Sequence, residues 1–295
     1  MNKKKLLKEA KYALRFLPDS LYIQLYYFGA FRKFCGLKNP HTYNEKLNWL
    51  KLNDRNPLYT TLVDKYEVKQ WVAERIGEEY IIPTLGVWNN FDEIDFDQLP
   101  NQFVLKCTHD SEGLAIVKDK RKFDRTTAKA NIQNALRYDF FYIGREWPYK
   151  NVKPRIIAEQ YMEDHTDGEL RDYKFFCFDG EPKTMFIASD RSKGETKFDY
   201  YDLAFNHLDI RQHYPNAGNV RKPVNFDKMI ELSKVLSKGL PHVRVDFYEV
   251  DGRVYFGELT FYHFSGFQPF IPAKWDKIFG DWLKLPKKTD CTNYN

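Results

Sequence analysis

The sequence predicts an α+β fold, with helices in its first part and antiparallel strands through much of the rest. Residues 1–62 carry apolar side chains at helical spacing and are divided by prolines and a glycine. From Tyr80 onward, short apolar runs alternate with turn residues, which is typical of strands and hairpins. A chain of 295 residues is long enough for about two domains, each with its own core.

Three helices are expected at the start of the chain, at 3–17, 21–34 and 42–52. The first is basic and amphipathic, so it is interpreted either as an ordinary surface helix or as a weak contact with anionic lipid. The third opens with Thr42-Tyr-Asn-Glu45, a capping box, and a fourth helix opens with Asp64 and Glu67 in the same roles. Lys65 lies in that first turn, where it can reach a phosphate or stay solvated.

Two short strands, Phe103–Cys107 and Leu114–Val117, enclose a polar loop that contains Ser111 and Gly113. With Lys106 on the first strand, this pattern is typical of a flap over a triphosphate, in which backbone N–H groups and a serine approach the phosphates. A plain hairpin is the alternative interpretation.

The later part of the chain alternates strands with helices. A strand is expected at 155–162, and Asp172–Phe178 and Lys183–Ala188 are expected to form a hairpin across Asp179-Gly180. Later helices are expected at 126–138, 226–238 and 275–283.

The stretch His242–Gly266 is expected to form a second hairpin, with Asp251-Gly252 as its turn signal. A two-residue turn would set Asp246 against Gly257 and put Glu258 on the opposite face of the strands. A three-residue loop, with its glycine left-handed as a bulge, would bring Asp246 and Glu258 to one side as diagonal neighbours.

Two carboxylates on one face of this hairpin predict a site for a hard cation. Arg244 lies beside Asp246 on the first strand, and Thr260 shares a face with Glu258 on the second. Mg²⁺ suits such a pair best, because it combines a couple of carboxylates with phosphate oxygens. A solvated hairpin face with ordinary charges is the alternative.

Composition narrows the classes of partner. The net charge of +5 is compatible with anionic ligands and is too small to indicate nucleic-acid binding. Four cysteines without a CxxC pair argue against a zinc site and favour a reducing cytoplasm. Asp95-Phe96-Asp97 has the form by which some glycosyltransferases hold a metal and a sugar nucleotide, although a turn is the alternative.

In this order, several segments resemble the ATP-grasp superfamily, and most closely its TupA-like branch, which is associated with teichuronopeptide and capsular polysaccharide biosynthesis. The resemblance extends roughly from Thr42 to Pro286. The segments that carry it are TYNEKLNWLK, LVDKYEVKQWV, FVLKCTHDSEG, GREWPYKN, KPRIIAEQYM, DYKFFCFDGEPK, VRVDFYEVDGRVYFGELTFY and SGF.

The resemblance implies an ATP-grasp fold, in which two α+β lobes clasp a nucleotide. The implied divisions are a helical N-terminal region at 1–62, a first lobe with the phosphate flap at 63–158, and a second lobe with the adenine hinge and metal site at 159–295. It implies ATP and Mg²⁺ as cofactors, and a carboxylate that attacks the γ-phosphate to form an acyl phosphate, which an amine then captures.

The resemblance also implies roles for individual residues. The implied nucleotide-binding residues are Lys65, Lys106, Ser111, Gly113, Glu159, Tyr161, Met162, Glu163 and Lys174. The implied catalytic residues are Lys106, Arg191 and Arg244, and the implied metal ligands are Asp246, Glu258 and Thr260. Within the set, Glu159 would receive the adenine amino group, and either Glu163 or Glu169 would bind the ribose.

The chain departs from the family pattern at two places. Glu112 puts a negative charge near the expected phosphates, and His263-Phe264 stands where Pro-Gly is expected. For His109 and His263, removal of a proton from the attacking amine and a structural role both remain open.

The leading hypothesis is an ATP- and Mg²⁺-dependent carboxylate–amine ligase in cell-surface polysaccharide biosynthesis. Its substrates would be a uronic-acid sugar unit or sugar nucleotide and an amino acid or other amine, and its protein partners would be other enzymes of the same biosynthesis. The alternatives are a sugar-nucleotide glycosyltransferase, an ATP-dependent sugar kinase and a non-catalytic nucleotide-binding scaffold.

Overall fold

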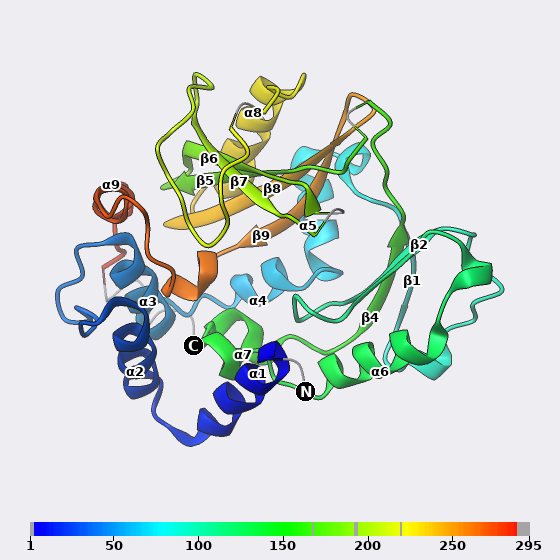
Figure 1. The fold of residues 1–295 in the computed structure, drawn as a ribbon, viewed down its shortest axis with the longest axis horizontal. Coiled ribbons are helices and arrows are strands. Elements are labelled where there is room, and N and C mark those ends of the chain that lie inside the picture. Colours follow the sequence, from blue (N-terminus) through cyan, green and yellow to red (C-terminus); the bar gives the residue numbers. More distant parts are fainter. Residues whose placement is uncertain (1–2, 167, 192–193, 219, 288–295) are drawn as a thin grey trace. The chain divides into compact units, whose positions relative to one another are not determined.

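The computed structural model describes residues 3–166, 168–191, 194–218 and 220–287 (Figure 1). The chain divides into two compact units. The first unit comprises Met1–Arg15 and Pro57–Met162, and the second comprises Phe16–Asn56 and Glu163–Asn295. Residues 16–56 therefore belong with the later part of the chain, whereas the predicted three-part division at 62 and 158 stays a prediction.

The first unit contains an antiparallel four-stranded sheet with the strand order β1-β4-β2-β3. Its strands are β1 (Thr84–Trp88), β2 (Phe103–Cys107), β3 (Leu114–Val117) and β4 (Ile156–Gln160). Its helices are α1 (Lys3–Ala13), α4 (Leu58–Val63), α5 (Glu67–Ile76), α6 (Arg125–Leu136) and α7 (Phe141–Gly144). The predicted bounds of β2 and β3 are confirmed.

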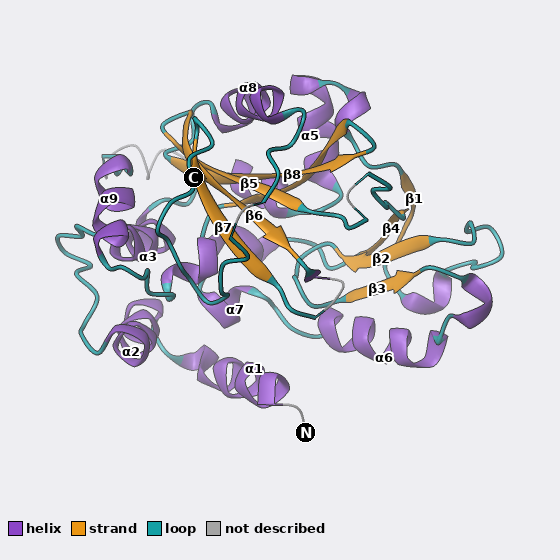
Figure 2. Cartoon of the chain, turned by 45° about the horizontal axis from the view of Figure 1, so that its top comes forward, coloured by secondary structure: helices purple, strands orange, loops and turns teal. Residues whose placement is uncertain are grey.

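Helix α6 covers one face of this sheet, and the core of the first unit lies beneath it (Figure 2). Alternate residues of β2 and β4 enter that core, among them Leu105 and Ala158, and they pack with Ile132 of the helix. Because side chains alternate along a strand, Lys106 and Glu159 lie on the other face of the sheet.

The second unit contains a five-stranded antiparallel sheet with the order β7-β6-β5-β8-β9. Its strands are β5 (Asp172–Phe178), β6 (Glu181–Ser189), β7 (Lys197–Asp202), β8 (His242–Val250) and β9 (Arg253–Thr260). Its helices are α2 (Asp19–Phe31), α3 (Tyr43–Asn53), α8 (Phe226–Ser237) and α9 (Lys274–Trp282). The sequence did not predict β7.

Helix α8 packs on one face of the second sheet, against β5, β6 and β8 (Figure 1). Its Phe226 ring lies 5.8 Å from the ring of Phe175 on β5. The opposite face carries an aromatic group at one end, where Tyr43 and Phe279 pack around Phe176 and Phe178. Lys174 and Asp246 lie on this opposite face, since they alternate with the core residues along β5 and β8.

Local signals account for how several of these elements begin and turn. The predicted capping box of Thr42 and Glu45 is present at the start of α3. The Asp64 carboxylate accepts hydrogen bonds from the backbone N–H groups of Tyr66 and Glu67, although regular helix begins only at Glu67. The β5–β6 turn places Asp179 and Gly180 at positive φ, as a tight hairpin turn requires.

No helix in the described part of the chain is both long enough and apolar enough to cross a bilayer.

Helices α3 and α9 approach each other so closely that Gly280 of α9 has no room for a side chain. A Cβ at Gly280 would lie 2.4 Å from the carbonyl oxygen of His41 and 2.8 Å from the backbone nitrogen of Tyr43. The contact is reinforced by Lys46, whose Nζ donates to the carbonyl oxygens of Gly280 and Leu283 at the end of α9.

We expect Gly280→Ala to lower the free energy of unfolding by about 1–3 kcal/mol, because the added methyl group overpacks this contact. The matched control is Gly29→Ala in α2, where a Cβ would meet no atom within 4 Å. That change should be neutral or stabilising by up to about 1 kcal/mol, because alanine favours helix. Urea unfolding of both variants measures the difference, and equal stabilities would contradict the packing of α3 on α9.

Candidate active site

Three charged residues lie side by side across neighbouring strands of the second sheet. Lys174 on β5 is opposite Asp246 on β8, and Asp246 is opposite Glu258 on β9. We call Lys174, Asp246 and Glu258 the charged row. Directly opposite residues share a face of a sheet, so the row brings one ammonium and two carboxylate groups together.

The predicted common face of Asp246 and Glu258 is present, but the predicted route to it is wrong. The turn has two residues, Asp251 and Gly252, both at positive φ, and Val250 pairs with Arg253 across it. The register shifts farther along, between Asp246 and Phe247, where Gly257 is the extra residue of a β-bulge. Asp246 and Glu258 therefore face each other directly and are not diagonal neighbours.

Arg244 donates hydrogen bonds to three other residues on this face of the sheet. Its Nε and Nη2 donate to the two carboxylate oxygens of Asp246, both at 2.7 Å. Nη2 also lies 3.2 Å from Oε1 of Glu258 and 3.0 Å from Oγ1 of Thr260. Its pKa is raised further above the usual range, because Asp246 and Glu258 outweigh the opposing effect of burial.

Asp172, an acid that the sequence prediction did not single out, connects Lys174 of the charged row with Arg191. Asp172 on β5 pairs with Lys174 at 3.0 Å and with Arg191, and Lys174 also pairs with Asp246. Burial by itself would raise the pKa of Asp172, but the charges of Lys174 and Arg191 outweigh it and lower that pKa. Asp172 precedes Lys174 by two residues on one strand face, which is the signal that could have found it.

The oxygen donors here fit Mg²⁺. Asp246 and Glu258 supply two carboxylates and Thr260 a hydroxyl, which is the hard-oxygen set that Mg²⁺ takes together with phosphate oxygens. In the described part of the chain, no three His, Cys, Asp or Glu side chains form a metal cluster. These metal ligands stay predictions.

The first unit places its own ion-pair cluster on the face of its sheet opposite to α6, where α5 contributes Lys69. Glu159 is buried, and its two carboxylate oxygens pair with Lys106 and Lys69. Burial would raise the pKa of Glu159, but the two lysines outweigh it and lower that pKa. The sequence prediction missed Lys69, which lies four residues after Lys65. The adenine contact of Glu159 stays a prediction.

The predicted flap loop is folded around Asp110. Its Oδ1 accepts hydrogen bonds from the N–H groups of Glu112 and Gly113, and its carbonyl oxygen accepts from Nζ of Lys65. Ser111 is exposed, whereas Gly113 is buried, and a Cβ there would lie 2.3 Å from Sγ of Cys107. Gly113 thus has a packing reason for being glycine besides its predicted phosphate contact.

Glu112 has a partner that the sequence did not reveal. Nζ of Lys8, on helix α1, lies 2.8 Å from Oε2 of Glu112 and 3.6 Å from Oδ2 of Asp110. This lysine is itself mostly buried, with a side chain that is 9% exposed. The negative charge that departs from the family pattern is therefore neutralised by the first helix of the chain.

The predicted hinge residues Tyr161 and Met162 follow β4. Tyr161 and Met162 are half-buried, and Nζ of Lys118 lies 5.6 Å from the centroid of the Tyr161 ring. Of the two candidate ribose acids, Glu163 is exposed. Glu169 pairs with Arg171 and accepts a hydrogen bond from the N–H of Asp190. The structure thus leaves Glu163 more open to a ligand than Glu169.

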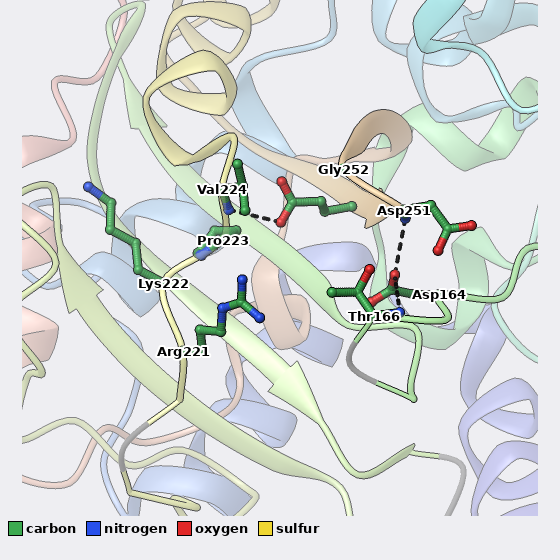
Figure 3. A pocket seen from close by; sticks show the side chains of 9 residues that line it. Asp164, Thr166, Arg221, Lys222, Pro223, Val224, Asp251 and Gly252 are labelled. Atoms are coloured by element: carbon green, nitrogen blue, oxygen red, sulfur yellow. Dashed lines mark hydrogen bonds between the residues drawn. The ribbon is translucent and has the colours of Figure 1, made fainter.

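Two other features lie apart from the charged row. Asp95 and Asp97 are exposed, and the Asp95 carboxylate accepts the N–H of Asp97 as in an ordinary Asx turn. A pocket of about 250 Å³ lies at the β8–β9 turn, and no predicted site residue lines it (Figure 3). There Asp164 accepts hydrogen bonds from the N–H groups of Thr166 and Asp251, so its carboxylate stabilises the loop.

We expect Glu159→Gln to destabilise the protein by about 2–3 kcal/mol at pH 7, since it leaves two partly buried lysines without their acid. Because the pKa of Glu159 is lower in the folded state than in the unfolded state, its stabilising effect is complete above about pH 5 and is lost as the pH falls through the folded value. The stability gap to the wild-type protein should therefore shrink on acidification in urea unfolding. The control Glu74→Gln, on the exposed side of α5, should show little gap at any pH.

The chain is similar to several solved structures at low sequence identity. Similar solved structures include D-alanine–D-alanine ligase from Bacillus anthracis complexed with ATP (16% identity, 68% of this chain and 55% of that chain, TM-score 0.39). Another is D-alanine–D-alanine ligase from Helicobacter pylori (15% identity, 83% of this chain and 71% of that chain, TM-score 0.42). A third is the ATP-grasp ligase PsnB complexed with minimal precursor, Mg and ADP (10% identity, 74% of this chain and 57% of that chain, TM-score 0.40). This chain spans little more than half the length of the first of them.

No curated protein sequence matches this chain significantly. The model of the TupA-like ATP-grasp family, however, matches residues 45–284. The predicted α+β class is confirmed by the two antiparallel sheets and their helices, and the predicted resemblance is confirmed by the match. Since it covers most of the chain, the protein belongs to the TupA-like ATP-grasp family.

Proposed function

We propose that this protein is an ATP- and Mg²⁺-dependent ligase that joins a carboxylate to an amine through an acyl phosphate. The carboxylate or the amine would belong to a uronic-acid sugar unit or sugar nucleotide in cell-surface polysaccharide biosynthesis, and an amino acid or other amine would be the second substrate. The reaction would take place in the cytoplasm, where ATP is available. The free, buried thiols of Cys35, Cys107 and Cys177 are compatible with that compartment.

The observation that carries the proposal is the charged row with Arg244 beside it. Lys174 and Arg244 stand next to two carboxylates suited to a divalent cation, on a preorganised sheet face. Phosphoryl transfer demands positioning and charge neutralisation more than a covalent catalyst, and this arrangement supplies both. Arg191, which pairs with Asp172, adds a third cation to Lys174 and Arg244 in the second unit. Lys65 and Lys106 are further phosphate ligands in this proposal.

The reaction balances in two steps. A substrate carboxylate oxygen forms a bond to the γ-phosphorus of ATP, and the bond from that phosphorus to the β–γ bridging oxygen breaks, so ADP leaves with the electron pair. The amine nitrogen then bonds to the acyl carbon, phosphate leaves, and the amine loses a proton to solvent or a nearby base. Arg244 would stabilise charge on the transferring phosphoryl group, and Lys174 would hold the phosphate chain.

When bound, Mg²⁺ would neutralise phosphate charge and orient the phosphate oxygens. Asp246, Glu258 and Thr260 are the residues that would hold it. Because Arg244 and Lys174 already bond the Asp246 carboxylate, the chain orients this acid before any ligand arrives. Burial raises the pKa of Asp246, and the charges of Arg244 and Lys174 oppose that rise.

We expect the wild-type protein to release ADP and phosphate when ATP, a uronate-bearing sugar and an amine pool are supplied together. Asp246→Asn and Glu258→Gln should each lower the rate by about 100-fold or more, because both weaken charge stabilisation in the transition state. The matched control, Asp95→Asn with Asp97→Asn, should leave the rate unchanged.

Other outcomes of this assay would separate the alternatives. ADP release that requires the sugar but not the amine would favour a kinase. Release of a nucleoside diphosphate from a sugar nucleotide, lost in the Asp95 and Asp97 variant, would favour a glycosyltransferase. Full activity in Asp246→Asn would contradict the proposed role of the charged row.

We expect Lys8→Met to raise the KM for ATP several-fold, roughly 3–10, with a smaller change in kcat. Without Lys8, the carboxylate of Glu112 in the predicted flap loop would lose its neutralising partner, and its repulsion of bound phosphates would cost about 1 kcal/mol. The double variant Lys8→Met, Glu112→Gln should recover most of the loss, and Lys129→Met, which breaks the exposed pair with Asp92, should have no effect. An unchanged KM in Lys8→Met would contradict this role for α1.

A further inference from the structure

A buried chain of hydrogen bonds extends from Arg244 away from the charged row. Nη1 of Arg244 lies 2.8 Å from Nδ1 of His263, and Nε2 of His263 lies 3.1 Å from Oε1 of Gln212. Oε1 of Gln212 also accepts from the hydroxyl of Tyr200 at 2.9 Å, and its Nε2 donates to the carbonyl oxygen of Gln268 at 3.0 Å. His263 is only 1% exposed.

The positions of the protons in this series of hydrogen bonds follow from the groups at its two ends, the Arg244 guanidinium and the carbonyl oxygen of Gln268. A guanidinium only donates hydrogen bonds, so Nδ1 of His263 must be an acceptor without a proton. The carbonyl oxygen of Gln268 requires the NH₂ group of Gln212 on its side, which turns the Gln212 oxygen toward His263. Nε2 of His263 therefore carries the proton, and the ring is a neutral imidazole of one defined tautomer.

The surroundings of His263 favour the same state. Burial and the nearby charge of Arg244 lower the pKa of His263, so the ring stays neutral over the physiological range. The Phe176 ring meets the imidazole edge-on at 4.9 Å, and the Phe186 ring lies at 5.5 Å. The imidazole is thus held both by its hydrogen bonds and by aromatic packing.

The backbone after His263 is also held in an unusual conformation. Phe264, Ser265 and Gly266 all have positive φ, which costs an ordinary residue about 1–2 kcal/mol each. Helix α3 fixes this turn, because Lys51 donates to the carbonyl oxygen of Ser265 and Asn48 to that of Gly266. Strain that the surrounding structure maintains is typical of functional positions.

We propose that His263 is a positioning residue for Arg244, acting as a hydrogen-bond acceptor that fixes the guanidinium plane against the charged row. This rests on the proposed function of Arg244. Asp246 binds the Nε and Nη2 edge of the guanidinium, and His263 binds Nη1, so two sides of the group are held. A donor fixed in this way costs no reorganisation when charge develops on the transferring phosphoryl group.

Two substitutions separate the acceptor from the packing. Asparagine keeps a polar atom near the place of Nδ1 and loses the ring, whereas phenylalanine keeps the ring and loses the acceptor. We expect His263→Phe to lower kcat about 10- to 100-fold, while the KM for ATP stays within about 3-fold of the wild-type value. His263→Asn should stay within about 3-fold of the wild-type kcat, although its melting temperature should fall further than that of His263→Phe.

The opposite order of activities would overturn the proposal, as would a His263→Phe variant with wild-type kcat. A second measurement does not depend on catalysis. In the wild-type protein labelled with ¹⁵N-histidine, NMR should show a ring protonated only at Nε2 near neutral pH, assigned to His263 by the loss of its signal in His263→Phe. A proton on Nδ1, or a doubly protonated ring, would overturn the proposal.

These results also distinguish this inference from the proposed function. If the wild-type protein never consumes ATP, the ligase proposal fails while the NMR result still decides the arrangement of His263 and Arg244. If ATP is consumed and His263→Phe is fully active, the positioning role fails and the ligase proposal stands.

Discussion

The two-point hydrogen bond from Arg244 to Asp246 is the interaction on which the candidate site depends. Both residues are buried, and a buried charge without a partner costs several kcal/mol. The second unit meets this constraint with three cations and three carboxylates. Lys174, Arg244, Asp172, Asp246 and Glu258 lie on one face of the sheet, and Arg191, just beyond β6, pairs with Asp172. The face is therefore electrically balanced before a ligand arrives, and binding of phosphates with a divalent cation would exchange partners among groups already in place.

The first unit follows the same rule with fewer residues. Glu159 is held by Lys69 and Lys106 on the sheet face opposite to the one that α6 covers. In each unit, paired charges lie on the sheet face opposite to one covering helix, α6 or α8, so the charged groups stand on rigid strands. Such placement gives a site more precise geometry than loops would supply. In the second unit, the face with the paired charges also carries buried aromatic rings at one end.

Much of this could be predicted from the sequence because it depends on local spacing. The capping box at Thr42, the turn at Asp179-Gly180 and the strands on either side of the flap loop are set by neighbouring residues, and the structure contains all of them. Strand β7 was missed because its central residues 198–201 are all buried, which hides the alternation that marks a strand. Its Asp199 is satisfied by N–H groups of residues 217 and 218, which no local pattern indicates.

Contacts between distant residues were likewise beyond sequence reasoning. The pairing of Lys8 with Glu112 joins residues 104 positions apart, and that of Lys69 with Glu159 requires the packing of α5 near β4. The protonation state of His263 needs both ends of its hydrogen-bond chain, including Gln212, which lies 51 positions earlier. Spacing alone could place His263 only near the end of β9.

The extra residue in β9 has a consequence for comparing relatives. Val254 and Phe256 face the core before Gly257, and Leu259 and Phe261 do so after it, so the buried positions change from even to odd numbers. An alignment that assumes unbroken alternation would assign Glu258 to the wrong side of the strand. Homologues that lack this glycine should instead carry their acid one position nearer to the hairpin turn, and a gap placed there aligns equivalent carboxylates.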